Sequence, residues 1–249
     1  MPELRIEDER FPLQDGLQDL RLFSELQRFL LKRIFHRGDA EARRKIVNPT
    51  NNEYLALSRE RDCAVLQLVS ADGTNLLSMA RVTALIAAVE ELRAQAEVGA
   101  LKALIITGNE KFFSVGADLN EISKLTGPAA FEFSQRGQEL MLLVDRFPVP
   151  VIAAIHGYCM GGGMDLALAC DYRIAARNAM FGHRGASLGV ITGWGGTQRL
   201  PRLIGKARAL QMFLLAEMVS AEEALRIGLV DKIAEDPVAE SIQRSQVFK

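Results

Sequence analysis

The sequence predicts an α/β protein with a largely parallel sheet. Two runs, Leu101–Thr107 and Val149–Ile155, are apolar on both faces, which is typical of strands that are covered on both sides. Helical patterns alternate with these runs: Met79–Ala96 is rich in alanine and leucine, and Phe131–Phe147 stops before Pro148. Strands and helices that alternate at this spacing favour parallel pairing through crossover connections.

The other predicted elements lie on either side of this region. Ala64–Val69 has the composition of a strand. Further along, Ser220–Glu223 has the pattern of a capping box, and Gly228 stands where that short helix should end. We expect helices to dominate from there to the C-terminus.

The first fifty residues differ from the rest of the chain. Leu17–Phe35 has apolar residues at 22, 23, 26, 29, 30 and 34, which predicts an amphipathic helix. A polar stretch follows, and Asn48–Asn52 is a turn cluster that indicates a boundary. We therefore expect an N-terminal helical extension over residues 1–52.

Composition excludes several classes of protein. The chain has 249 residues, with 30 Lys plus Arg against 31 Asp plus Glu and a net charge of −1. Apolar residues make up 49%, so disordered, collagenous and coiled-coil chains are excluded. The balanced charge argues against binding to nucleic acid or to an anionic membrane.

The sequence shows no targeting or membrane segment. The charged N-terminus lacks the apolar core of a signal peptide, and no run approaches the ~18 apolar residues of a membrane span. We therefore expect a cytoplasmic protein.

Metal binding is not expected. The three cysteines are far apart with no CxxC spacing, and the three histidines are scattered with no HExxH motif. This pattern predicts neither a disulfide framework nor a metal site.

Three glycine-bearing segments are candidates for a functional site: 112–119, 156–165 and 181–189, the last leading to a further glycine cluster at 193–196. In the second segment, the triplet Gly161–Gly163 lies between a buried strand and an apolar helix. Glycines that open a helix leave backbone N–H groups accessible at the positive end of the helix dipole, where they can stabilise an oxygen that becomes anionic. The alternative is that they only allow close packing of strand and helix.

The third segment contains a GxSxG match around Ser187, the pattern of a serine hydrolase nucleophile elbow. That fold needs a catalytic histidine after the serine in the chain, but no histidine follows His183. The apolar strand that should lead into the elbow is also missing, so a hydrolase of this type is rejected.

Four motifs together resemble the enoyl-CoA hydratase/isomerase (crotonase) family. The resemblance covers roughly Glu53 to Ile233, and Asn75 also fits an Ala-Leu-Asn-Ala position of that family. The motifs, in chain order, are FSVGADL (113–119), PVIAAIHGYCMGGGMD (150–165), GWGGTQRLPR (193–202) and SAEEALRIGLV (220–230).

The resemblance implies a crotonase-like spiral of ββα units with flanking helices, assembled into trimers or pairs of trimers. It also implies an enzyme of fatty acid metabolism that acts on acyl-CoA thioesters as substrate, with no permanently bound cofactor. The thioester oxygen would be held by the amides of Ala117 and Gly162. The residues expected to line the channel for coenzyme A are Val115, Gly116, Asp118, Leu119 and Asn120, and Gly185 is a further expected substrate-binding position.

The sequence departs from the family at the acid–base groups. The resemblance implies two catalytic glutamates, which in hydratases of the family hold a water molecule and move its proton. In this chain Asp165 stands at the first of these positions and Gly185 at the second. Loss of a positioned acid or base generally costs about 10²–10⁴ in rate. If 181–187 is extended, His183 and Ser187 would face the same side as Gly185, and His183 is the better candidate base. Asp165 could instead only stabilise the first turn of its helix, and His183 could be a surface residue.

Gly185 is also compatible with two further hypotheses. The glycine could leave a hole for a bound anion or water, as in the similar dihydroxynaphthoyl-CoA synthases, although that branch has an aspartate where this chain has Thr192. An isomerase with one base is a further option. The leading hypothesis is an enoyl-CoA hydratase, a lyase, that uses Ala117, Gly162, Asp165 and His183. The alternatives are another acyl-CoA reaction, such as isomerisation, cyclisation or C–C hydrolysis, or a catalytically weak acyl-CoA-binding subunit.

The chain stops sooner after the last motif than family members usually do. We expect a core over residues 53–233 and a short tail over 234–249 with one short helix. The predicted helix at Leu17–Phe35 could occupy the place of the missing C-terminal helices, or it could be an independent extra helix.

Overall fold

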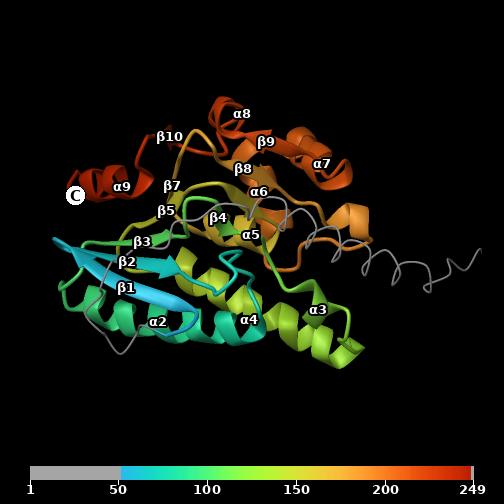
Figure 1. Ribbon diagram of the computed structural model, residues 1–249, viewed down its shortest axis with the longest axis horizontal. Coiled ribbons are helices and arrows are strands. Elements are labelled where there is room, and N and C mark those ends of the chain that lie inside the picture. The colour runs from blue at the N-terminus through green and yellow to red at the C-terminus, as the bar shows by residue number, and fades with distance from the viewer. Residues whose placement is uncertain (1–51, 248–249) are drawn as a thin grey trace, which may run out of the picture. The chain divides into compact units, whose positions relative to one another are not determined.

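Two sheets and their flanking helices make up residues 52–247, the part of the chain that the computed structural model describes (Figure 1). The predicted N-terminal extension and its helix at Leu17–Phe35 lie outside these residues. The strands are β1 (Leu55–Glu60), β2 (Cys63–Leu68), β3 (Ala103–Thr107), β4 (Phe112–Ser114), β5 (Val151–Ile155), β6 (Tyr158–Met160), β7 (Tyr172–Ala175), β8 (Met180–Gly182), β9 (Met218–Ser220) and β10 (Lys232–Ile233). The helices are α2 (Met79–Glu97), α3 (Leu119–Ile122), α4 (Gly127–Asp145), α5 (Gly162–Ala169), the 3₁₀ turn η1 (Gly185–Leu188), α6 (Gly196–Ile204), α7 (Lys206–Leu214), α8 (Ala221–Arg226) and α9 (Pro237–Ser245).

The strands alternate between two sheets. The larger sheet has the order β1-β2-β3-β5-β7-β10 and is parallel except for the β1–β2 hairpin. The smaller sheet has the order β4-β6-β8-β9 and is parallel except for the β8–β9 pair. Thus β3, β5 and β7 are each followed by a strand of the smaller sheet and then by a helix. This repeat is the predicted spiral of ββα units.

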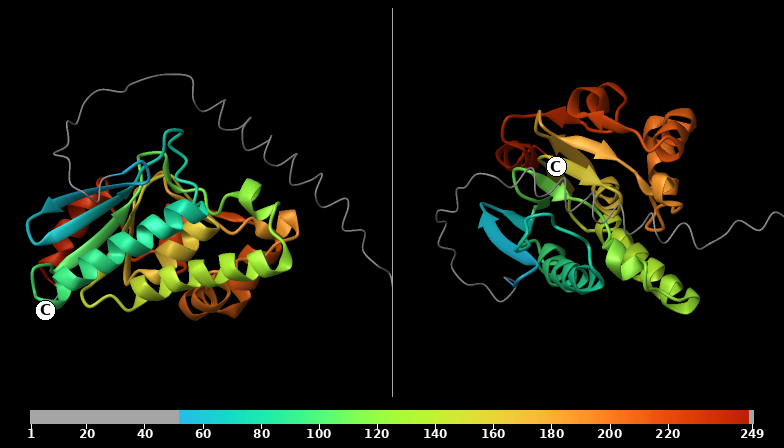
Figure 2. Two further views of the ribbon diagram at one scale, coloured as in Figure 1. Left: turned by 90° about the horizontal axis from the view of Figure 1, so that it is seen from below. Right: turned by 45° about the vertical axis from the view of Figure 1, so that its right-hand side comes forward.

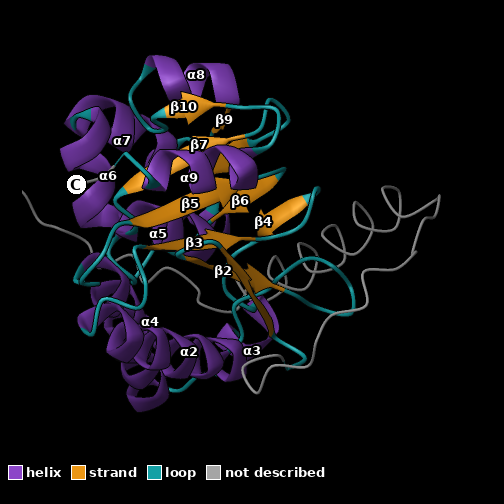
Figure 3. Cartoon of the chain, turned by 90° about the vertical axis from the view of Figure 1, so that its left-hand side faces the viewer, coloured by secondary structure: helices purple, strands orange, loops and turns teal. Residues whose placement is uncertain are grey.

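The central strands are buried on both faces, as their apolar runs predict. Leu104 and Ile106 of β3 point into the main core, which α2, α4 and α5 also line. The intervening Ala103 and Ile105 point to the opposite face, where Val238 and Ile242 of α9 pack. Neighbouring residues of a strand face opposite sides, so an all-apolar strand needs a helix on each side. Helices α2 and α4 run side by side (Figure 2), on one side of the strands (Figure 3).

The predictions of the main elements are confirmed, with shifts at the ends. The helix α4 begins four residues before the predicted start, because Pro128 in its first turn needs no N–H there and does not interrupt it. The three-residue strands β4, β6 and β8 were not predicted, since so short a run has no measurable periodicity. Helices dominate after residue 220, as predicted, and the two-residue strand β10, which was not predicted, pairs with the edge of β7.

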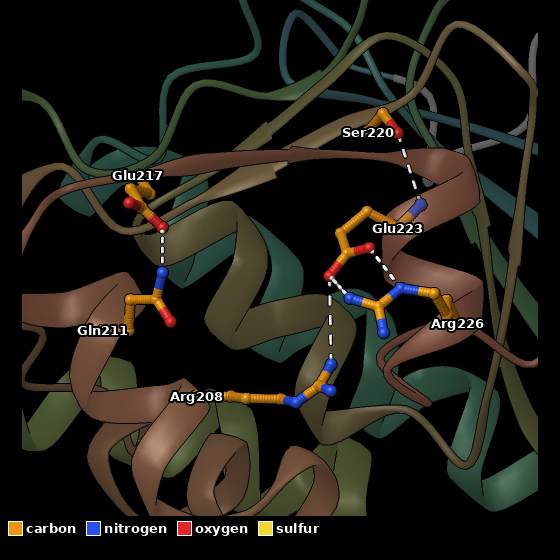
Figure 4. A network of polar contacts seen from close by, with 6 residues as sticks. All are labelled: Arg208, Gln211, Glu217, Ser220, Glu223 and Arg226. Carbon is orange, nitrogen blue, oxygen red and sulfur yellow. Dashed lines mark hydrogen bonds and ion pairs between the residues drawn. The ribbon is translucent and has the colours of Figure 1, made fainter.

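The serine half of the predicted capping box is formed at the start of α8. The Ser220 hydroxyl accepts a hydrogen bond from the Glu223 amide at 3.3 Å, and the helix ends before Gly228 (φ 80°). The Glu223 carboxylate also binds Arg226 of α8 at 2.5–2.6 Å and lies 3.9 Å from Arg208 of α7 (Figure 4). Arg208 thus connects α7 to α8, whereas the Arg226 pair lies within α8.

We predict that Ser220→Ala lowers the free energy of unfolding by about 1 kcal/mol, because one amide of the first turn of α8 loses its acceptor. Arg226→Ala should cost less than Ser220→Ala, since its ion pair is exposed to solvent. Urea unfolding of both variants measures the difference. A larger loss from Arg226→Ala than from Ser220→Ala would contradict this ranking.

Candidate active site

The glycine triplet opens helix α5, as predicted. Gly161 is the N-cap, with φ 51°, a conformation that favours glycine. Gly163 allows close packing, because a methyl group placed on it would lie 2.7 Å from Cβ of Ser114. Gly162, between them, is the first residue of the helix, so its amide has no acceptor inside the helix. The triplet therefore both packs closely and leaves one amide without an acceptor in the helix.

The segment that contains Ala117 lies against this helix end. A methyl group placed on Gly116 would be 3.0 Å from the amide nitrogen of Gly162. One placed on Gly162 would be 3.4 Å from the amide nitrogen of Ala117. Neither the Ala117 nor the Gly162 amide donates a hydrogen bond to any residue among 52–247. The structure thus brings together two unused N–H donors from segments 45 residues apart in the chain.

Hydrogen bonds from the loop before α2 fix the Ala117 segment. The Leu77 amide donates to the carbonyl oxygen of Gly116 at 2.8 Å. Asn75, buried and with φ 54°, donates from Nδ2 to the carbonyl oxygens of Phe112 and Phe113. The Ser114 hydroxyl donates to the carbonyl oxygen of Asn75 at 2.7 Å and accepts from the Gly116 amide at 3.1 Å. Ser114 was not singled out from the sequence, because its partners are set by the fold.

Asp165 and His183 form a buried pair beside the start of α6. Asp165 Oδ1 lies 3.4 Å from His183 Nε2, and both side chains are almost completely buried. The Thr192 hydroxyl donates to Oδ2 of Asp165. A methyl group on Gly196 would collide with Asp165 Oδ1 and lie 3.1 Å from His183 Nε2. The start of α6 can approach the pair because position 196 has no side chain.

Burial changes the pKa values of both groups toward their neutral forms. It raises the pKa of Asp165 to about 7, although the Thr192 hydroxyl and the positive charge of Arg199 oppose the shift. Burial also lowers the pKa of His183 to about 4. Near neutral pH the histidine is therefore neutral, and the carboxyl group titrates in the working range of a general base.

The extended conformation that was considered for residues 181–187 is not formed. Strand β8 ends at Gly182, and η1 begins at Gly185, so residues 183, 185 and 187 do not share a face. Ser187 is exposed and donates its hydroxyl to the carbonyl oxygen of Arg184 at 2.7 Å. His183 is buried, so the expectation of a surface histidine is also wrong. Of the residues proposed to compensate for Gly185, the structure places only His183 beside Asp165.

The space beside Gly185 is filled by backbone. A methyl group on Gly185 would lie 2.5 Å from the carbonyl oxygen of Val190. The Val190 amide in turn donates to the carbonyl oxygen of Gly185 at 3.0 Å. In the direction that a side chain would take, there is thus no hole for an anion or water.

Trp194 is a further residue at this site that the sequence did not identify as functional. Its six-membered ring would lie 2.6 Å from a methyl group on Gly162, so the indole covers that end of α5. The indole Nε1 donates to the carbonyl oxygen of Phe133 in α4 at 3.3 Å. No feature of the local sequence indicates this contact, which joins three distant segments.

The residues expected to line a coenzyme A channel follow Ala117 directly. The Asp118 carboxylate caps the short helix α3 by accepting from the Asn120 amide at 2.8 Å. Val115, Asp118 and Leu119 are partly buried, and Asn120 is exposed. Their role in binding stays a prediction.

Within residues 52–247, no group of three or more His, Cys, Asp or Glu side chains is arranged to hold a metal ion. The same residues contain no helix with the length and apolar character needed to span a membrane.

Comparisons with known proteins agree with the motifs. Residues 58–247 match the family model for enoyl-CoA hydratase/isomerase. The crotonyl-CoA hydratase of Syntrophomonas wolfei is 40% identical over 184 residues, covering 74% of this chain and 70% of the relative. A probable enoyl-CoA hydratase of Bacillus subtilis is 45% identical over 149 residues. This match covers 59% of this chain and 57% of the relative, which is less than two thirds of the relative's length.

Solved structures share the fold. DspI of Pseudomonas aeruginosa has a TM-score of 0.74 at 34% identity, covering 79% of this chain and 80% of that one. The enoyl-CoA hydratase of Bacillus anthracis has a TM-score of 0.73 at 34% identity, covering 78% and 75%. The predicted resemblance and fold class are confirmed. The ββα spiral, the family-model match over residues 58–247 and these relatives show that the chain belongs to the enoyl-CoA hydratase/isomerase, or crotonase, family.

Proposed function

We propose that this protein is an enoyl-CoA hydratase, a lyase that adds water across the double bond of a 2-enoyl-CoA thioester. The observation that carries the proposal is the pair of adjacent, unused amides at Ala117 and Gly162. The names of the relatives from Syntrophomonas wolfei and Bacillus subtilis support the reaction. The Asp165–His183 pair gives the proposal its acid–base group.

The two amides would hold the thioester oxygen. When the oxygen of water bonds to C3, the electrons of the C2=C3 π bond form a C1=C2 double bond, and the carbonyl π electrons move onto the thioester oxygen to give an enolate. Each preorganised N–H donor aimed at such a charge is worth about 3–4 kcal/mol of barrier. The enolate then collapses as C2 takes up a proton, which gives the 3-hydroxyacyl thioester.

Asp165 and His183 would move the protons. The Asp165 carboxylate accepts the proton that water loses, and neutral His183 at 3.4 Å keeps that proton within the pair until C2 receives one. The Thr192 hydroxyl fixes the orientation of the carboxylate. One carboxylate with an imidazole would thus replace the two carboxylates of related hydratases, and Gly185 would take no direct part.

Substrate binding and assembly are part of the same proposal. Val115, Gly116, Asp118, Leu119 and Asn120 would line the path of the coenzyme A thioester, which is the substrate, and the protein would need no resident cofactor. It would work in the cytoplasm as a homotrimer or hexamer. Large apolar side chains exposed on α6, α7 and α8 support self-association: Leu203, Leu210, Leu214 and Leu225.

We predict that the protein hydrates crotonyl-CoA and that Asp165→Ala and His183→Ala each lower kcat by about 10²–10⁴-fold. The loss of enoyl thioester absorbance measures turnover, and calorimetry measures crotonyl-CoA binding. Ser187→Ala is the control and should keep the original rate, because Ser187 faces solvent. Binding without turnover in the unaltered protein would overturn the proposal in favour of an acyl-CoA-binding subunit.

The raised pKa of Asp165 predicts a pH effect on stability. Because the folded protein holds this proton more tightly than the unfolded chain does, Asp165 contributes a fall in the free energy of unfolding as the pH rises from about 4 to about 7. The lowered pKa of His183 contributes an opposing rise between about pH 4 and 6.5, so the Asp165 contribution is read from the difference between two proteins. Asp165→Asn, which does not titrate at this position, should gain stability relative to the unaltered protein as the pH rises from about 4 to 8, although it loses activity. Urea unfolding across the pH range measures both proteins. The control Glu222→Gln makes the same acid-to-amide change at an exposed position and should keep the original activity.

We predict that Gly185→Glu does not raise kcat, although it puts a glutamate at the family's second position. The new Cβ would press on the Val190 carbonyl at 2.5 Å, and such overpacking costs about 1–3 kcal/mol of stability. Thermal unfolding and crotonyl-CoA turnover measure the two effects. Ala186→Glu, at an exposed neighbouring position, controls for the added charge. A faster Gly185→Glu enzyme would show that the loop can shift and admit the carboxylate.

A further inference from the structure

We propose that Trp194 limits the acyl group of the substrate to short chains, by closing the space next to the thioester carbonyl. This inference rests on the proposed function and adds the substrate class: short, unbranched 2-enoyl thioesters. Trp194 lies in the loop between η1 and α6, within the GWGG motif.

The position of the indole relative to the two amides supports this role. A methyl group placed on Gly162 would lie 2.6 Å and 2.8 Å from Cζ3 and Cε3 of Trp194, and 3.4 Å from the amide nitrogen of Ala117. The ring edge and the Ala117 amide therefore both lie within 3.4 Å of one methyl-sized point. A thioester oxygen that accepts from both amides would bring its carbonyl carbon close to this ring, and the acyl chain continues from that carbon.

The indole fits into a slot that two glycines provide. On one side is Gly162 in α5. On the other is Gly137 in α4, where a methyl group would collide with Nε1, Cδ1 and Cε2 of the ring. Phe133 packs on the ring with centroids 5.1 Å apart. Any side chain at position 137 or 162 would displace the indole, so its place depends on both glycines.

Hydrogen bonds of Gly193 and Trp194 attach this loop to α4. The carbonyl oxygen of Gly193 accepts from Gln138 Nε2 at 2.8 Å and from the Ser134 hydroxyl at 3.2 Å. Indole Nε1 donates to the carbonyl oxygen of Phe133 at 3.3 Å, and only 3% of Trp194 is exposed. These contacts oppose a swing of the ring to admit a longer chain. Trp194 is thus a fixed wall, and apolar pockets discriminate chain length by about 10–200-fold per methylene where the fit is tight.

The test compares kcat/KM for crotonyl-CoA and trans-2-decenoyl-CoA in the full-length protein. The unaltered protein should prefer crotonyl-CoA. Trp194→Leu and Trp194→Ala should raise the ratio of decenoyl to crotonyl kcat/KM by at least about tenfold, because they remove the wall. Trp194→Phe, which keeps an aromatic ring, should change the ratio less. If Trp194→Ala does not fold, the Leu and Phe variants still decide the question.

Phe147→Ala is the matched control. It also removes a buried aromatic side chain, but just beyond the far end of α4 from Phe133. It should lower stability without changing the chain-length ratio. A preference of the unaltered protein for decenoyl-CoA, or Trp194 variants with an unchanged ratio, would overturn the inference while leaving hydration intact. No hydration of either thioester by the unaltered protein would instead overturn the proposed function.

Discussion

The contact between segment 114–117 and the first turn of α5 is the constraint on which the site depends. It brings the backbone of Gly116 next to that of Gly162, and it is possible only because Gly163 has no side chain to collide with Ser114. The repeated step from the larger sheet to the smaller one places both segments at the same edge, since β4 and β6 are parallel neighbours. The ββα spiral thus converts two distant glycine motifs into one pair of adjacent amides.

Around this contact, the acid–base group differs from the two carboxylates expected of the family. Asp165 lies one turn into the same helix as Gly162, so its distance from the Gly162 amide is set by α5 itself. His183 follows β8, which pairs with β6 immediately before α5. The pair is therefore held by the same elements that hold the amides. Its burial accounts for a lone carboxyl group with a pKa near neutrality in the absence of a second carboxylate.

The sequence predicted what depends on local patterns. The apolar runs of β3 and β5 predicted buried strands, the glycine triplet predicted the start of α5, and Ser220 predicted the start of α8. His183 was a candidate base beside Gly185 on the condition that 181–187 is extended, but the chain turns at η1 and His183 lies beside Asp165 instead. Ser114 and Trp194 were missed because their partners are remote in sequence: position in the fold, not residue type, defines their roles.

The placement of Trp194 has a practical consequence for spectroscopy. It is the chain's sole tryptophan, so the protein's indole emission comes from one known position. That position touches the helix end bearing the Gly162 amide. Intrinsic fluorescence of this protein is therefore a label-free reporter located at the candidate site, sensitive to whatever molecule replaces solvent or side chains around that single fluorophore.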